Sequence, residues 1–411
     1  MAGTRRFTAL HALGLTLLLG VPALAADSAP PPVLSGLDVL VEHGFSELRG
    51  LRVGLISNQT GRDRKGRTSV QIFANASGMT LSALFSPEHG FAGVSEDSSV
   101  VSGIFALPDG RTIPLYSLYG ATRTPTAEML SGLDALVFDI QDAGARFYTY
   151  STTMALSLEA AARAGIDYVV LDRPNPVNGD SLEGPVLEEG LRSFISYLRV
   201  PVRHGFTMGE LARLHNLGAG LGAKLTILPL KGWRRSMWYD QTGLPWTRPS
   251  PNLPDLASAA LYPGLACFEP FNVSVGRGTP MPFRWVGAPW LDAAAALKRL
   301  KAAGLPGVEF SLAAFTPEKD IFKGVACPGV RVNVIDRDAA RPLRVFAHMA
   351  AVLRDLHPGP LKVDYERLTR MVGSRRFVEL YKAGAPAAEL EAALSAGLDE
   401  FRARRAAFLL Y

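Results

Sequence analysis

The N-terminal half of the chain alternates short apolar runs with segments of helical spacing, and this order restricts the fold more than any other feature. Residues 68–76 and 151–165 have helical spacing. Strands are predicted at residues 51–56, 81–85, 135–140, 168–171 and 225–230. Parallel strands that are buried on both faces have continuous apolar sequences, and they alternate with helices. We therefore expect an α/β, Rossmann-like domain with a parallel sheet over residues 37–235.

The C-terminal part, residues 236–411, mixes strands and helices without regular alternation. Strands are predicted at 308–315 and 330–335, and helices at 291–303, 343–356 and 388–410. We expect a smaller α+β domain that completes a cleft with the first domain. Two helix starts are predicted upstream, a capping box at Thr207–Glu210 and an N-cap at Thr124 with Pro125 in the first helical position.

Residues 1–25 have the three parts of a secretory signal peptide. Arg5 and Arg6 form the basic region, residues 7–21 are largely apolar, and Ala23–Ala25 fits a cleavage site. A membrane anchor is the alternative, but the apolar stretch is shorter than the ~20 residues of a spanning helix. We expect a periplasmic or secreted protein with no stable membrane insertion after cleavage, and the choice between Sec and twin-arginine export stays open.

Composition and absent motifs exclude several function classes. Without Arg5 and Arg6, Lys and Arg number 41 against 38 acidic residues, and no basic block suggests a nucleic-acid partner. There is no Gly-x-Ser-x-Gly, His-Glu-x-x-His or Cys-x-x-Cys motif. The glycine-rich run at 218–223 follows a predicted helix, which is the wrong context for a dinucleotide loop. No metal or cofactor is predicted, and Cys267 and Cys327 could form a disulfide or remain two buried thiols.

Four polar clusters carry the candidate chemistry. They comprise residues 86–90 with Glu88 and His89, 138–150 with Asp139, Asp142, Arg146, Tyr148 and Tyr150, 172–179 with Arg173 and Asn175, and 268–279 with Glu269 and Arg277. Three of the four directly follow predicted strands. Ligands in open α/β sheets bind at the carboxyl ends of the strands, so these side chains are expected to meet at one edge.

Each of these residues also has a structural interpretation. Glu88 could cap a helix or pair with an arginine, and His89 could satisfy a buried hydrogen bond. The aspartates could brace loops, the arginines could form internal ion pairs, and the tyrosines could be core residues with a polar tip. Glu269 could be a wall residue of the cleft with no chemical role. Two separated carboxylates are nevertheless what glycoside hydrolysis requires.

Long motifs in these clusters resemble one known family, the NamZ-like exo-β-N-acetylmuramidases, formerly a domain of unknown function. The motifs are Gly54–Gly61, Ser86–Gly90, Asp139–Asp142 with Arg146–Tyr150, Asp172–Pro176, Arg203–Gly205, Pro249–Asn252 and Asn272–Thr279. The resemblance runs from about Leu37 to the C-terminus. One departure is Phe268-Glu269-Pro270-Phe271-Asn272, where we expect Phe-Glu-Gly-Thr-Asn, and another is Val275, where some relatives have Glu.

The resemblance implies an exo-acting glycosidase that releases N-acetylmuramic acid from the non-reducing ends of muropeptide or other peptidoglycan-derived glycans. It implies that Glu88 is the catalytic glutamate. We expect Glu88 to be the general acid, with His89 shaping its environment and Glu269 or Asp142 as second carboxylate. The substrate-binding candidates are Asn58, Arg146, Tyr148, Arg173, Asn175 and Arg277. The arginines among them suit the lactyl carboxylate of muramic acid. The alternative is a non-catalytic periplasmic sugar- or peptidoglycan-binding protein.

Overall fold

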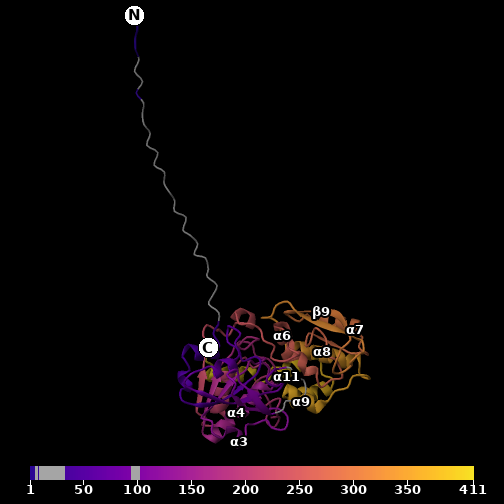
Figure 1. The fold of residues 1–411 in the computed structure, drawn as a ribbon. Coiled ribbons are helices and arrows are strands. Elements are labelled where there is room, and N and C mark those ends of the chain that lie inside the picture. Colours follow the sequence, from indigo (N-terminus) through magenta and orange to yellow (C-terminus); the bar gives the residue numbers. More distant parts are fainter. Residues whose placement is uncertain (5–7, 9–32, 94–101) are drawn as a thin grey trace. The chain divides into compact units, whose positions relative to one another are not determined.

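The computed structural model describes residues 1–4, 8, 33–93 and 102–411. Apart from residues 1–4 and 8, the predicted signal peptide lies outside the described residues. The helices and strands below belong to Pro32–Tyr411, which forms one compact unit (Figure 1).

A seven-stranded sheet forms the N-terminal half, in the order β3-β4-β2-β1-β5-β6-β7. The strands are β1 Arg52–Ser57, β2 Thr80–Ser86, β3 Gly103–Ala106, β4 Thr112–Ser117, β5 Ala135–Asp139, β6 Asp167–Leu171 and β7 Leu225–Leu228. All pairs are parallel except β3 with β4. The predicted α/β fold is confirmed. The edge strand β3 and its neighbour β4 are not predicted from sequence, because both are short and partly exposed and β4 contains Pro114.

Helices cover both faces of this sheet. They are α1 Gly36–Glu42, α2 Ser69–Ala74, α3 Ala127–Leu130, α4 Tyr150–Ala164 and α5 Met208–Gly218, with a 3₁₀ turn at Ser46–Leu48. Leu37 of α1 and Phe73 of α2 belong to one core cluster, and Leu158 of α4 and Leu211 of α5 belong to another. The capping box at Thr207 is confirmed. The N-cap predicted at Thr124 is wrong, because Thr126 accepts the capping hydrogen bond of α3.

The C-terminal half contains a three-stranded antiparallel sheet, ordered β8-β10-β9, and a set of helices. Its elements are α6 Leu256–Leu265, β8 Trp285–Gly287, α7 Ala293–Ala302, β9 Val308–Phe315, β10 Cys327–Val334, α8 Pro342–Leu356, α9 Tyr365–Val372, α10 Arg375–Lys382, α11 Ala387–Leu394 and α12 Leu398–Arg405, with 3₁₀ turns at Tyr239–Thr242, Ala266–Phe268 and Ala406–Phe408. The single helix predicted at 388–410 is wrong, because Gly397 adopts φ +75° and separates α11 from α12.

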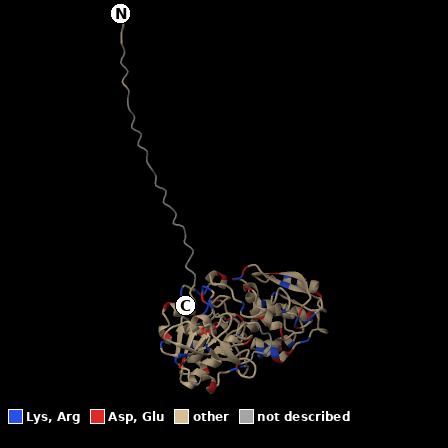
Figure 2. Ribbon diagram, viewed as in Figure 1, with Lys and Arg blue, Asp and Glu red and all other residues tan. Residues whose placement is uncertain are grey.

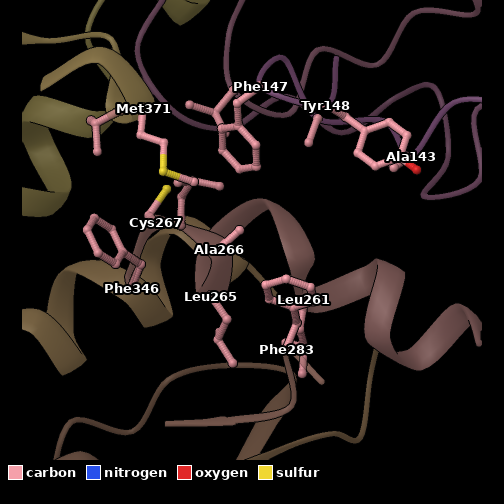
Figure 3. Packing of buried hydrophobic residues seen from close by; sticks show 14 of the residues in the cluster. Ala143, Phe147, Tyr148, Leu261, Leu265, Ala266, Cys267, Phe283, Phe346 and Met371 are labelled. Carbon is pink, nitrogen blue, oxygen red and sulfur yellow. The ribbon is translucent and has the colours of Figure 1, made fainter. Parts of the chain in front are cut away.

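One apolar cluster joins the two halves. Figure 3 shows Phe147 and Tyr148, which follow β5, above the helix that carries Leu261 and Leu265. Cys267 lies in the same cluster beside Met371. Both cysteines are buried free thiols, so the disulfide alternative is not realised in this structure.

Charged residues of both signs are interspersed over the described part of the chain (Figure 2). Among the described residues, no helix combines the length and the apolar character that crossing a bilayer requires.

Arg146 connects the two halves through a guanidinium that is 1% exposed. It donates to the carbonyl oxygens of Pro185, Val200, Met371 and Val372 at 2.6–3.1 Å and to a serine hydroxyl. Desolvation lowers the pKa of Arg146 to about 10, so at neutral pH a charged group is solvated here by carbonyl dipoles and one hydroxyl. A Cβ at Gly373 would lie 2.3 Å from this guanidinium, which explains the glycine there.

Replacing Arg146 with Met should lower the free energy of unfolding by at least about 3 kcal/mol, because four buried carbonyl groups lose a charged donor. Urea unfolding would measure the change. Arg64→Met is the control, since Arg64 is exposed and should change stability by less than about 0.5 kcal/mol. Similar losses for both variants would contradict a connecting role.

Candidate active site

The carboxyl ends of the central strands bring the predicted site residues to one edge of the sheet. Ser57 at the end of β1 pairs with Asp139 of β5, and Ser86 at the end of β2 pairs with Ser117 of β4. The chain leaves β1 for β2 on one side and later returns to its other side as β5. This reversal is the topological switch point at which open α/β sheets bind ligands.

Glu88 lies two residues beyond β2, in a turn where His89 adopts φ +69° and Gly90 φ +74°. Left-handed conformations at non-glycine residues are uncommon and are found at functional turns. The Glu88 side chain is half-buried. The Thr149 hydroxyl donates to its Oε2 atom at 2.5 Å. Since Thr149 is the N-cap residue of α4, the carboxylate lies at the positive end of a 15-residue helix.

Tyr119 is the second partner of Glu88. It lies two residues beyond Ser117, as Glu88 does beyond Ser86, so the pairing of those serines brings the two side chains together. Burial, the charge of Glu88 and a hydrogen bond to Glu88 raise the pKa of Tyr119 to about 12. Thr149 and Tyr119 therefore each provide a hydroxyl group that is hydrogen-bonded to Glu88.

Asn58 supports the backbone around Glu88. Its Nδ2 donates to the Tyr150 hydroxyl at 3.0 Å, and that hydroxyl donates to the carbonyl oxygen of Pro249 at 2.8 Å. Asn58 Oδ1 accepts from the amide and hydroxyl of Thr60. Asn58 is 2% exposed and bonded through both its oxygen and its nitrogen, so its contribution to a site would be structural.

Three tyrosine side chains pack together near the candidate carboxylates. The ring of Tyr148 packs edge-on against Tyr150 at 4.7 Å and Tyr262 at 5.8 Å. Burial raises the pKa of Tyr262, and the charges of Glu269, Glu88 and, most weakly, Asp142 raise it further. All three carboxylates therefore lie within electrostatic reach of one phenol group. The structure thus brings together the two halves' acidic clusters, with Tyr148 among them.

Glu269 follows the 3₁₀ turn after α6 and is held by two arginines. Arg277 Nη1 lies 3.3 Å from its Oε1, and Arg367 Nη2 lies 3.1 Å from its Oε2. Arg277 also pairs with Asp320 at 3.0 Å. Burial raises the pKa of Glu269, and the two guanidinium groups oppose that rise.

Asp142 is 6% exposed and lies at the start of the loop after β5. Its Oδ2 accepts the backbone N–H of Gly144 at 2.8 Å and lies 3.4 Å from His204 Nε2. Its Oδ1 is buried without a hydrogen-bond partner among the described residues. Such an atom has capacity for one further donor.

Two of the predicted substrate arginines and Asn175 have structural partners instead. Arg173 pairs with Asp139 at 2.6 Å, with side-chain exposures of 5% and 0%. Asn175 donates to Phe206 O and accepts from Val177 N. Together with the five bonds of Arg146, these contacts argue against direct ligand contact by all three residues, because each is buried and bonded to other groups of the protein.

Sequence reasoning missed Tyr119, Thr149 and Tyr262 as neighbours of the carboxylates. Thr149 lies inside a quoted motif, and its place directly before a predicted helix could have marked it as the residue at that helix's N-terminus. No sequence signal could have found Tyr119, because the strand before it was not recognised.

Among residues 33–93 and 102–411, no group of three or more His, Cys, Asp or Glu side chains could hold a metal ion. A cavity of about 420 Å³ lies on the surface that includes Arg192, Tyr197, His215 and Arg404. None of its lining residues is a predicted site residue.

Comparisons with known proteins bear on the family of the chain. Models described as "Exo-beta-N-acetylmuramidase NamZ", N-terminal and C-terminal, match residues 53–257 and 260–411. The peptidoglycan β-N-acetylmuramidase NamZ of Bacillus subtilis (strain 168) is 42% identical over 328 residues, which are 80% of this chain and 79% of that protein. The chain belongs to the NamZ family. The predicted family is therefore confirmed, and with it the class of enzyme, a glycoside hydrolase.

Two solved DUF1343 proteins from Bacteroides fragilis NCTC 9343 share the fold. One has a TM-score of 0.85 and 35% identity, covering 92% of this chain and 99% of that structure. The other has a TM-score of 0.74 and 28% identity, covering 93% and 99%. The match to the NamZ C-terminal model begins further along the chain than the domain boundary predicted at residues 235 and 236, which stays a prediction.

Arg173→Met should lower the free energy of unfolding by about 3–5 kcal/mol, because it leaves the buried Asp139 charge unpaired. Arg277→Met should cost less than about 1 kcal/mol, since Arg277 is 30% exposed. Urea unfolding of both variants would measure the difference. Equal losses of unfolding free energy would contradict a structural role for Arg173 that Arg277 does not share.

Proposed function

We propose that this protein is an exo-acting β-N-acetylmuramidase that releases N-acetylmuramic acid from the non-reducing ends of peptidoglycan fragments, with Glu88 as general acid. The observation that carries the proposal is the position of Glu88 at the switch point of the sheet, flanked by Thr149 and Tyr119. The Bacillus subtilis relative is named for the same activity. A secretory signal peptide at residues 1–25 would bring the enzyme to peptidoglycan outside the cytoplasm.

The chemistry requires a proton for the departing sugar oxygen, since an alkoxide is a poor leaving group. Glu88 would deliver that proton, and the left-handed turn at His89 would fix the direction of its side chain. A second carboxylate would then support the positive charge at the anomeric carbon or activate the attacking group.

Glu269 is the second carboxylate in this proposal. Of the three acidic groups it acts most strongly on the Tyr262 phenol, and Glu88 acts next most strongly. Arg277 and Arg367 favour the charged form of Glu269, which this role requires. The anomer released first, observed by NMR, would distinguish retention, with carboxyl groups roughly 5–5.5 Å apart, from inversion at roughly 6.5–9.5 Å.

Glu88→Gln should lower kcat by about 10²–10⁴-fold on a muramyl disaccharide, because the leaving oxygen receives no proton. The loss should be smaller on a nitrophenyl muramide, whose leaving group departs without protonation. Released sugar and nitrophenol would be measured beside circular dichroism spectra. Glu400→Gln, an exposed carboxylate in α12, is the control and should keep full activity. Near-normal turnover of the disaccharide by Glu88→Gln would remove Glu88 from the chemistry.

Thr149→Val should lower kcat by about 10–100-fold, because it removes a donor to a charged group. That donor stabilises the negative charge that develops on Glu88 as its proton leaves. Thr149→Ser keeps the hydroxyl and should restore the rate. An equal loss of rate in Thr149→Ser would indicate a packing role only.

A further inference from the structure

Arg123 lies near Glu88 and differs from the other arginines discussed above, which all bond to groups of the protein. Arg146 and Arg173 are occupied by buried carbonyls and by Asp139. Arg277 and Arg367 both pair with Glu269. Arg123 is exposed, and within the described parts of the chain no carboxylate lies at ion-pair distance from it. Its guanidinium therefore has its donors available for a ligand.

Contacts connect Arg123 to the proposed general acid through two aromatic rings. Tyr119, which bonds to Glu88, packs against Phe194 with ring centroids 6.0 Å apart. The Arg123 guanidinium lies 4.5 Å above the centroid of the Phe194 ring. The charge of Arg123 also acts on the Tyr119 phenol, which places it near the site edge and not on a remote surface.

Phe194 is held firmly enough to orient this arginine. It lies in a two-residue turn closed by backbone bonds between Ser193 and Ser196 at 2.9 and 3.1 Å. The Ser196 hydroxyl donates to Arg370 O at 3.0 Å, which ties the turn to the C-terminal half. A guanidinium stacked on an aromatic face loses little further freedom when its N–H groups bind a ligand.

We propose that Arg123, oriented by Phe194, binds the lactyl carboxylate of the muramyl residue. A planar guanidinium matches a carboxylate with two parallel hydrogen bonds, which a neutral N-acetylglucosaminyl residue cannot form. Arg123 is thus the residue that distinguishes muramyl from glucosaminyl ends, and Phe194 is a positioning residue. The inference rests on the proposed function, and it replaces Arg146 and Arg173 in the role that the sequence suggested for them.

The test compares the nitrophenyl β-glycoside of N-acetylmuramic acid with its neutral lactyl methyl ester. Wild type should prefer the acid. Arg123→Gln should raise KM for the acid by about 10–100-fold and leave KM for the ester and kcat unchanged, so the preference disappears. Arg123→Lys should recover only part of it, because an ammonium lacks the paired donors. Phe194→Leu should give an intermediate KM.

Arg192→Gln is the matched control, because Arg192 also lies over an aromatic ring, 3.7 Å from the Tyr197 centroid, but borders the separate 420 Å³ cavity. It should behave as wild type. Retained preference in Arg123→Gln, or its loss only in Arg277→Gln, would overturn the proposal.

Binding of free N-acetylmuramic acid and N-acetylglucosamine, measured by calorimetry, separates this inference from the proposed function. A wild type that hydrolyses neither glycoside but binds the acid sugar through Arg123 would contradict the glycosidase proposal alone. Equal binding of the two sugars by wild type and Arg123→Gln would contradict the Arg123 proposal whatever the turnover.

Discussion

The buried guanidinium of Arg146 is the interaction on which the rest of the site depends. Its five acceptors come from the loop after β6 and from the end of α9, which are far apart in the chain. Glu88 and Glu269 belong to different halves of the protein. Because Arg146 and the apolar cluster around Cys267 hold one half against the other, the loops that carry the two carboxylates are held relative to each other, as the proposed glycoside hydrolysis would require.

The register between neighbouring strands also fixes the positions of side chains around Glu88. The pairing of Ser86 with Ser117 sets Tyr119 beside Glu88, and α4 begins where Thr149 reaches the same carboxylate. The proposed acid is thus surrounded by groups on rigid elements, although Glu88 itself lies in a loop. A loop residue held by a sheet edge and a helix N-terminus combines access to substrate with a fixed direction.

The fold and the gathering of polar loops at one sheet edge were predictable from sequence, while the partners of the arginines were not. Continuous apolar runs give the parallel strands, and polar residues directly after them give the edge where Glu88 and Asp142 lie. An arginine in a polar loop has the same local sequence whether carbonyls or a ligand will occupy it. The structural role of Arg146 depends partly on the carbonyl oxygens of Met371 and Val372, which lie more than 200 residues away in the sequence. Arg123 lacked any motif and could be found only through Phe194.

Two residues that depart from the family pattern near Glu269, Phe271 and Val275, lie in the core. Phe271 is 3% exposed and packs against Phe268 and Tyr381, with ring centroids 5.2 and 5.8 Å away. Val275 is likewise buried in the core. Glu269, which precedes Pro270, instead faces Arg277 and Arg367. Since the bulkier Phe271 side chain packs into the C-terminal core while Glu269 pairs with the two arginines, the altered motif is compatible with the chemistry that its relatives' names describe.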